Sequence, residues 1–163
     1  MREDWIRKVE EFAPNMIAVS VVESTYSLGR QMIECLPKES KDTVVLWGGV
    51  FATFGVEKIL GEGEGEYVSR GEGELSIVEF CKRARDGERL DDVPNIWTRQ
   101  GGKLIGNQMR SEMVNLDDLP FADYSLFDDQ AIYRPMQGRM WRTVGLETQR
   151  GCPYTCTYCN TPS

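Results

Sequence analysis

Three cysteines near the end of the sequence have the spacing of a metal-cluster loop. They are Cys152, Cys156 and Cys159, in the arrangement C-x3-C-x2-C, and Tyr158 stands directly before the last of them. Three thiolates can bind three irons of a cubane iron–sulfur cluster, whereas most clusters that only transfer electrons have four cysteine ligands. The fourth iron would then be open to a substrate or cofactor. The segment Gly151–Cys159, here called the cysteine loop, therefore predicts chemistry at a cluster.

Two other interpretations of the cysteine loop are a zinc site and a set of unrelated free thiols. A structural zinc ion usually has four protein ligands, but the chain contains no histidine, and the other two cysteines, Cys35 and Cys81, fall on expected helix faces. The lack of histidine also excludes Ser-His-Asp and Cys-His mechanisms within this sequence. Five cysteines are an odd number, which favours metal binding over a disulfide framework.

The composition predicts a soluble, cytoplasmic protein with one domain, or one domain and an appendage. The chain has 163 residues, 40% of them hydrophobic, and a net charge of −7. This charge argues against nucleic acid or an anionic membrane as the main partner. No apolar stretch approaches the roughly 20 residues that cross a bilayer, and the N-terminus lacks the apolar segment of a signal peptide.

Apolar runs alternate with amphipathic segments in the first half of the chain, which predicts a parallel α/β sheet. Buried strands are expected at 16–22, 43–47 and 66–69, and helices at 4–12, after Ser24 or Thr25 to Pro37, at 54–60 and at 74–86. In the last helix, Leu75, Val78, Cys81 and Ala84 recur at the spacing of an inward face. A hairpin is expected next, because Gly101-Gly102 separates two short strand-like segments.

The rest of the chain predicts a connector and a further strand. Residues 107–142 lack clear periodicity, as in an extended connector. Residues 143–149 alternate as a strand would, and Arg150-Gly151 would turn that strand into the cysteine loop. We therefore predict three parts: a partial α/β domain at 1–90, a hairpin with an irregular connector at 91–142, and a strand with its cysteine loop at 143–163.

Small residues follow each of the three expected strands. Ser20 ends the first, Gly48-Gly49 the second and Gly71-Glu72-Gly73 the third. Ligands of open parallel sheets bind beyond the carboxyl ends of the strands, where glycines let the backbone approach a ligand and expose amides to phosphate. The simpler interpretation is that these glycines only turn strands into helices. Their occurrence at all three strand ends favours a ligand site.

These motifs, in this order, resemble the cobalamin-binding domain of many radical S-adenosylmethionine enzymes. The resemblance covers roughly residues 4–90 and rests on Ser20 with Ser24, on Gly48 to Thr53 and on Arg70 to Glu74. It implies a flavodoxin-like fold with a cleft for the nucleotide tail of cobalamin, lined by Ser20, Ser24, Gly48, Gly49, Phe51, Gly71, Glu72 and Gly73. The sequence departs from the family in two ways: the first two strands of that fold are absent, and Phe51 stands where many relatives have histidine.

The cysteine loop is similar to the radical S-adenosylmethionine signature in its spacing and in the aromatic residue before the last cysteine. The similarity implies the first strand of a β/α barrel, with a 4Fe-4S cluster on Cys152, Cys156 and Cys159. S-adenosylmethionine would chelate the fourth iron and be cleaved reductively to a 5′-deoxyadenosyl radical, with Tyr158 against the adenine. It also implies a small-molecule substrate and an electron donor such as flavodoxin or ferredoxin.

Together the two resemblances favour an N-terminal fragment of a cobalamin-dependent radical methyltransferase that transfers methyl groups to unactivated carbon. We expect this fragment to be truncated at both ends and inactive alone, because most of a barrel is lacking. Two alternatives stay open. One is a radical cyclase or oxidoreductase whose first domain does not use cobalamin, and the other is a non-catalytic cobalamin-binding module.

Overall fold

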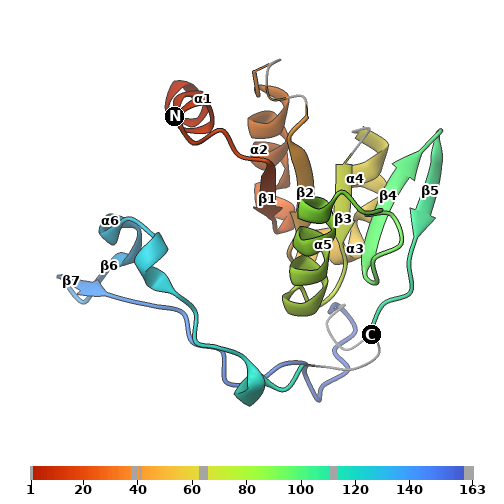
Figure 1. Ribbon diagram of the computed structural model, residues 1–163. Coiled ribbons are helices and arrows are strands. Elements are labelled where there is room, and N and C mark those ends of the chain that lie inside the picture. The colour runs from red at the N-terminus through yellow and green to blue at the C-terminus, as the bar shows by residue number, and fades with distance from the viewer. Residues whose placement is uncertain (1, 38–39, 41, 63–65, 111–113, 160–163) are drawn as a thin grey trace. The chain divides into compact units, whose positions relative to one another are not determined.

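The computed structural model describes residues 2–37, 40, 42–62, 66–110 and 114–159, which divide into two units at residues 113 and 114 (Figure 1). The elements of the first unit are α1 (Arg2–Phe12), β1 (Met16–Ser20), α2 (Glu23–Glu34), β2 (Val44–Gly48), α3 (Val50–Phe54), α4 (Val56–Glu62), β3 (Glu66–Ser69), α5 (Glu74–Asp86), β4 (Ile96–Gln100) and β5 (Lys103–Gly106). Those of the second are two 3-10 helices, η2 (Leu116–Asp118) and η3 (Tyr124–Leu126), α6 (Asp129–Ile132), β6 (Tyr133–Met136) and β7 (Arg139–Arg142).

The first unit contains a five-stranded sheet in the order β1-β2-β3-β4-β5. β1, β2 and β3 run parallel, and β4 and β5 add to β3 as an antiparallel hairpin. The predicted α/β fold is therefore confirmed. We expected the hairpin to lie outside the α/β domain, in the segment 91–142, but the structure pairs it with β3 and makes it part of the sheet. β1 lies at the edge of the sheet, and its residues Ala18 and Ser20 are exposed.

Helices cover both faces of the sheet (Figure 1). On one face, Trp47 and Val68 of the strands pack with Ala52 and Ile59 of α3 and α4. On the other face, Phe80 of α5 packs on Leu46 and Ile96. The alternation of side chains along each strand explains why neighbouring residues such as Leu46 and Trp47 enter different cores.

A buried ion pair joins α2 to β3 inside the first core. Arg30 Nη1 donates to Glu66 Oε1 at 2.6 Å, and the other carboxylate oxygen accepts from Trp47 Nε1 at 2.7 Å. Arg30 also donates to the carbonyl of Ile59 at 2.9 Å, and its guanidinium lies 4.7 Å from the centre of the Trp47 ring. Burial opposes the charge of Arg30, yet the hydrogen bonds to Glu66 and Tyr26 raise its pKa on balance.

Three local expectations for the helices of the first unit were wrong. The N-cap of α2 is Val22, and Thr25 instead accepts a hydrogen bond from the Val22 amide at 3.1 Å. The helix expected at 54–60 is two helices, α3 and α4. In α5 the buried residues are Ser76 and Phe80, whereas Leu75 and Val78 are exposed. The core of β2 and β4 contacts only the side of α5 that carries Phe80.

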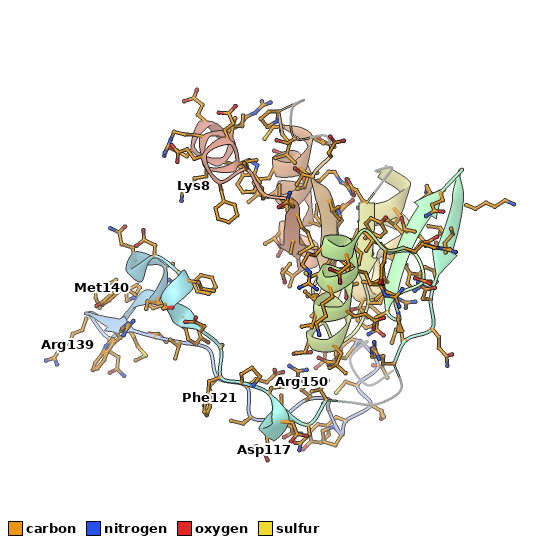
Figure 2. The ribbon with its side chains drawn as sticks, in the orientation of Figure 1. Lys8, Asp117, Phe121, Arg139, Met140 and Arg150 are labelled. Atoms are coloured by element: carbon orange, nitrogen blue, oxygen red, sulfur yellow. The ribbon has the colours of Figure 1, made fainter. Side chains whose placement is uncertain are left out.

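The second unit is built from short elements with few buried side chains. Each short helix begins at a polar cap: the Asn115, Asp123 and Asp128 side chains accept from backbone amides two residues later. The hydroxyl and amide of Ser125 lower the pKa of Asp123. Figure 2 shows Phe121 and Arg139 projecting from this unit, and Phe121 is 95% exposed. Residues 143–150 have no regular secondary structure, so the strand expected at 143–149 is not formed.

Candidate cofactor site at the strand ends

The carboxyl ends of β1 and β2 meet at one edge of the sheet. Ser20 pairs in register with Gly48, and the Val21 amide then donates to the Gly48 carbonyl at 2.9 Å. The Phe51 amide donates in turn to the Val21 carbonyl at 3.1 Å. The structure thus brings together Ser20, Gly48 and Gly49, which the sequence predicted to share a cleft.

Gly49 is the residue at this edge whose identity the geometry requires. Its φ is +88°, in the region that favours glycine. A Cβ atom at this position would lie 2.7 Å from the Val21 carbonyl oxygen and 2.9 Å from the Ser20 hydroxyl. A side chain at this position would therefore collide with the end of β1, so the close packing of the two strand ends requires glycine. The backbone of Gly49 is exposed and faces solvent beyond the sheet, where a ligand can reach it.

Residues Arg70–Gly73, here called the glycine loop, follow β3 at the same end of the sheet. The Gly71 amide donates to Thr53 Oγ1 at 3.0 Å, and Arg70 Nε donates to the Thr53 carbonyl at 3.0 Å. Thr53 Oγ1 also lies 3.4 Å from the Gly49 carbonyl. Thr53 therefore links the second and third predicted glycine segments into one site.

The other residues predicted to line the site differ in their exposure to solvent and in the groups that they contact. Ser24 is exposed in the first turn of α2, and Glu72 is exposed in the glycine loop. The Gly73 carbonyl accepts from the Ser76 hydroxyl at 3.3 Å. The ring of Phe51 packs 4.9 Å from that of Tyr26 and lies against the core, so it is turned into the protein.

Exposed apolar side chains stand on the elements that begin or end at these strand ends. Val22 follows β1 and is 49% exposed, while Val50 and Phe54 at the two ends of α3 are 63% and 48% exposed. Large apolar side chains that remain exposed beside a polar, glycine-lined edge are typical of a binding site for an organic ligand. Ser20, Gly48, Gly49 and the glycine loop, with these apolar side chains beside them, are here called the strand-end site. It combines polar backbone groups with apolar contacts.

Two residues of the site were missed by sequence reasoning. Thr53 was recognised only as part of a motif, and Asn95 was placed in the hairpin. Asn95 is 3% exposed with a φ of +70°, and its side chain donates to two carbonyls of the glycine loop. The only signal in the sequence was an asparagine before an apolar strand, because asparagine tolerates a positive φ.

The cysteine loop lies in the second unit and is largely exposed. Cys152 and Cys156 are exposed and Cys159 is half-buried, with the Cys159 amide donating to the Cys156 carbonyl at 3.1 Å. Tyr158 is 88% exposed. The donor chemistry of three thiols fits an iron–sulfur cluster. Within the described residues, however, no three His, Cys, Asp or Glu side chains are grouped as metal ligands, so the cluster assignment stays a prediction.

One known protein family and several known proteins match this chain. The B12 binding domain family matches residues 1–80. The chain is also 24% identical over 163 residues to an uncharacterized methyltransferase of Pyrococcus horikoshii, covering 96% of this chain and 34% of that protein. The hopanoid C-3 methylase of Methylococcus capsulatus is 26% identical over 165 residues, covering 96% of this chain and 30% of the relative.

Solved structures confirm the predicted α/β fold. The radical S-adenosylmethionine methyltransferase TsrM from Kitasatospora setae, with cobalamin and a [4Fe-4S] cluster bound, matches with a TM-score of 0.63 and 22% identity. The match covers 99% of this chain and 34% of TsrM. The family match over residues 1–80, the curated relatives and the shared fold together confirm the resemblance of this chain to radical S-adenosylmethionine enzymes with a cobalamin-binding domain.

The chain spans about a third of the length of the curated relatives that it matches. In the part of the chain that the structure describes, no helix has both the length and the apolar character that a membrane span needs.

Proposed function

We propose that the strand-end site of the B12 binding domain binds cobalamin and that the whole protein is a cobalamin-dependent radical S-adenosylmethionine methyltransferase. The observation that carries the cobalamin proposal is the open backbone at the paired ends of β1 and β2, where Gly49 is exposed and a Cβ atom added at Gly48 would meet no atom within 4 Å. The nucleotide tail of cobalamin contains a phosphodiester, and exposed backbone amides at strand ends suit such a group. Val22, Val50 and Phe54 offer apolar surface to the rest of the cofactor.

Each part of the site has a distinct role in this proposal. Gly48 leaves room for close approach of the tail and Gly49 exposes its backbone, while Ser20 and Ser24 present hydroxyl groups at the end of β1 and at the start of α2. The glycine loop offers backbone groups from the third strand end. Bound cobalamin would carry the methyl group. The side chain of Phe51 is turned toward Tyr26, so in this proposal only its backbone borders the site.

The chain contains no histidine, so no imidazole of these 163 residues can ligate cobalt. This chain would therefore hold cobalamin through the surroundings of the tail and the corrin ring. Affinity should depend on the strand-end site rather than on a metal–ligand bond.

For the second unit we propose that Cys152, Cys156 and Cys159 hold a 4Fe-4S cluster and that Tyr158 contacts S-adenosylmethionine. Their spacing and the cluster bound by TsrM support this assignment. A bound cluster with an open iron would supply an electron to S-adenosylmethionine. The substrate would be a small molecule, and an external donor such as flavodoxin or ferredoxin would reduce the cluster.

A charge placed in the first turn of α2 tests the cobalamin site. Ser24→Asp adds a carboxylate that suits the helix N-terminus but should repel the phosphodiester. We expect the apparent Kd for hydroxocobalamin to rise at least about tenfold, measured by equilibrium dialysis, with the melting temperature unchanged.

Ser27→Asp is the matched control, because Ser27 is exposed one turn further along α2 and carries the same change of charge. The Kd of the Ser27→Asp variant for hydroxocobalamin should stay within about twofold of the Kd of the parent chain. A folded parent chain that retains no cobalamin would overturn the proposal. Binding of cobalamin without any cluster would instead favour a cobalamin-binding module.

A further inference from the structure

Asn95 lies between β3 and the β4–β5 hairpin, and every polar group that it has is hydrogen-bonded. The residue is 3% exposed and has a φ of +70°. Its Nδ2 atom donates to the carbonyls of Arg70 at 2.9 Å and Glu72 at 3.3 Å. Both acceptors belong to the glycine loop, so the Asn95 side chain is hydrogen-bonded to the backbone of this loop at two positions.

The opposite side of the amide is fixed by the end of the hairpin. Asn95 Oδ1 accepts from the Arg110 amide at 2.7 Å, and the Asn95 amide donates to the Gln108 carbonyl at 3.2 Å. The Arg110 guanidinium pairs with Glu79 of α5. With two carbonyls on one side and an amide on the other, only one orientation of the Asn95 side chain satisfies all three partners.

The glycine loop is thus held from two sides. Thr53 binds the Gly71 amide and Arg70 on the side of α3, and Asn95 binds the carbonyls of Arg70 and Glu72 on the side of the hairpin. Gly71 has a φ of +68°, and glycine restricts the backbone least of all residues. The conformation of this segment therefore depends on bonds from outside it.

We infer that Asn95 is a positioning residue for cobalamin: it sets the place of the glycine loop without touching the cofactor. The inference rests on the proposed function, since it assigns a role to a residue behind the same site. It follows that loss of the Asn95 amide weakens cobalamin binding more than it weakens the fold.

Asn95→Gly separates these two effects. Glycine adopts a φ of +70° without strain, which offsets part of the stability lost with the side-chain bonds. We expect the Kd for hydroxocobalamin to rise about tenfold, as loss of the two hydrogen bonds to the glycine loop implies. Hydrogen exchange of the Gly71–Gly73 amides should become faster, while exchange within β4 and β5 stays as in the parent.

Asn95→Asp and Asn107→Asp form a matched pair. Asn107 Nδ2 donates to the carbonyls of Asp91, Val93 and Ile96. Its side-chain amide is therefore hydrogen-bonded to several backbone carbonyls, as that of Asn95 is, but none of these carbonyls belongs to the glycine loop. Both variants set a carboxylate against carbonyl oxygens and should lower the melting temperature. Only Asn95→Asp should also raise the Kd for cobalamin, by more than Asn95→Gly does.

The outcomes separate the inference from the proposed function. If the parent binds cobalamin and Asn95→Gly binds it equally well, Asn95 is not a positioning residue. If Asn107→Asp weakens binding as much as Asn95→Asp, the effect comes through general stability and the inference fails as well. If the folded parent binds no cobalamin, the proposed function itself fails.

Discussion

The two units hold their chemically informative residues in opposite ways. In the first unit, the strand-end site rests on a sheet with two cores, and buried partners such as Asn95 and Thr53 fix its loops. In the described part of the second unit, Ile132 is the one hydrophobic residue that is buried, and Cys152 and Cys156 are exposed. A backbone site can be complete within one sheet, whereas a cluster loop needs its metal, and in a barrel its neighbouring strands, to be held in place.

The largest expected effect concerns the cysteine loop. Anaerobic reconstitution with iron and sulfide should give the parent chain broad visible absorbance and about four irons per chain. Cys156→Ala should abolish both, because two thiolates leave half of the irons without a protein ligand. The half-buried Cys35 lies outside the loop, so Cys35→Ala should behave as the parent.

Equal iron and absorbance in Cys156→Ala and the parent would show adventitious iron rather than a cluster. Stoichiometric zinc in the purified chain, lost in Cys156→Ala, would favour the zinc interpretation of the same cysteines. Either result would mean that the contrast between the two units is not one between two cofactor sites.

The second largest expected effect is on the free energy of unfolding, and it is tested with two arginine–glutamate pairs, one in each unit. The side chains of Arg30 and Glu66 are 8% and 9% exposed, whereas those of Arg150 and its partner Glu147 are 12% and 55% exposed. Arg30→Met leaves a buried carboxylate without its cation and should lower the free energy of unfolding by about 3 kcal/mol. Arg150→Met should lower it by less, by about 1 kcal/mol, since the Glu147 carboxylate that remains is solvated.

Urea unfolding followed by circular dichroism measures both changes. The double variant with Arg30→Met and Glu66→Gln should recover part of the loss, because no unpaired charge then remains buried. Similar losses from Arg30→Met and Arg150→Met would mean that the second unit is as firmly packed as the first.

Local sequence patterns predicted much of the first unit. β3 and α5 have the predicted bounds, and the Gly101-Gly102 hairpin forms, because glycine supplies the positive φ of a two-residue turn. The β6–β7 hairpin has the same kind of turn at Gln137-Gly138, with φ of 52° and 75°. It was missed because glutamine is not a typical residue for this conformation and Pro135 argues against a strand.

Contacts between distant residues could not be predicted in this way. Arg30 and Glu66 are 36 positions apart, and nothing in the local pattern of α2 indicates a buried cation. The inward face of α5 was wrong for a similar reason, since Leu75 and Val78 have the right spacing but Phe80 meets the sheet. The glycines of the site could be predicted because they lie at strand ends, whereas Asn95 reaches the same loop only through the pairing of β4 with β3.

The smallest expected effect is a pH dependence that belongs to the first unit. Tyr67 of β3 is half-buried, with its ring 5.0 Å from that of Phe80, and burial together with the Asp91 carboxylate raises its pKa. An unfolded tyrosine ionises near pH 10, so above about that pH the folded state retains a proton that the unfolded state has lost. This contribution to stability is fully present below about pH 10 and is lost as the pH rises through the folded pKa.

Tyr67→Phe keeps the ring but removes the titration, so its urea midpoint should fall less steeply than that of the parent between about pH 9 and pH 11. Identical slopes in the two proteins would mean that the hydroxyl is as well solvated in the fold as in the unfolded chain, and that the core beneath α5 is more open than its buried Phe80 implies.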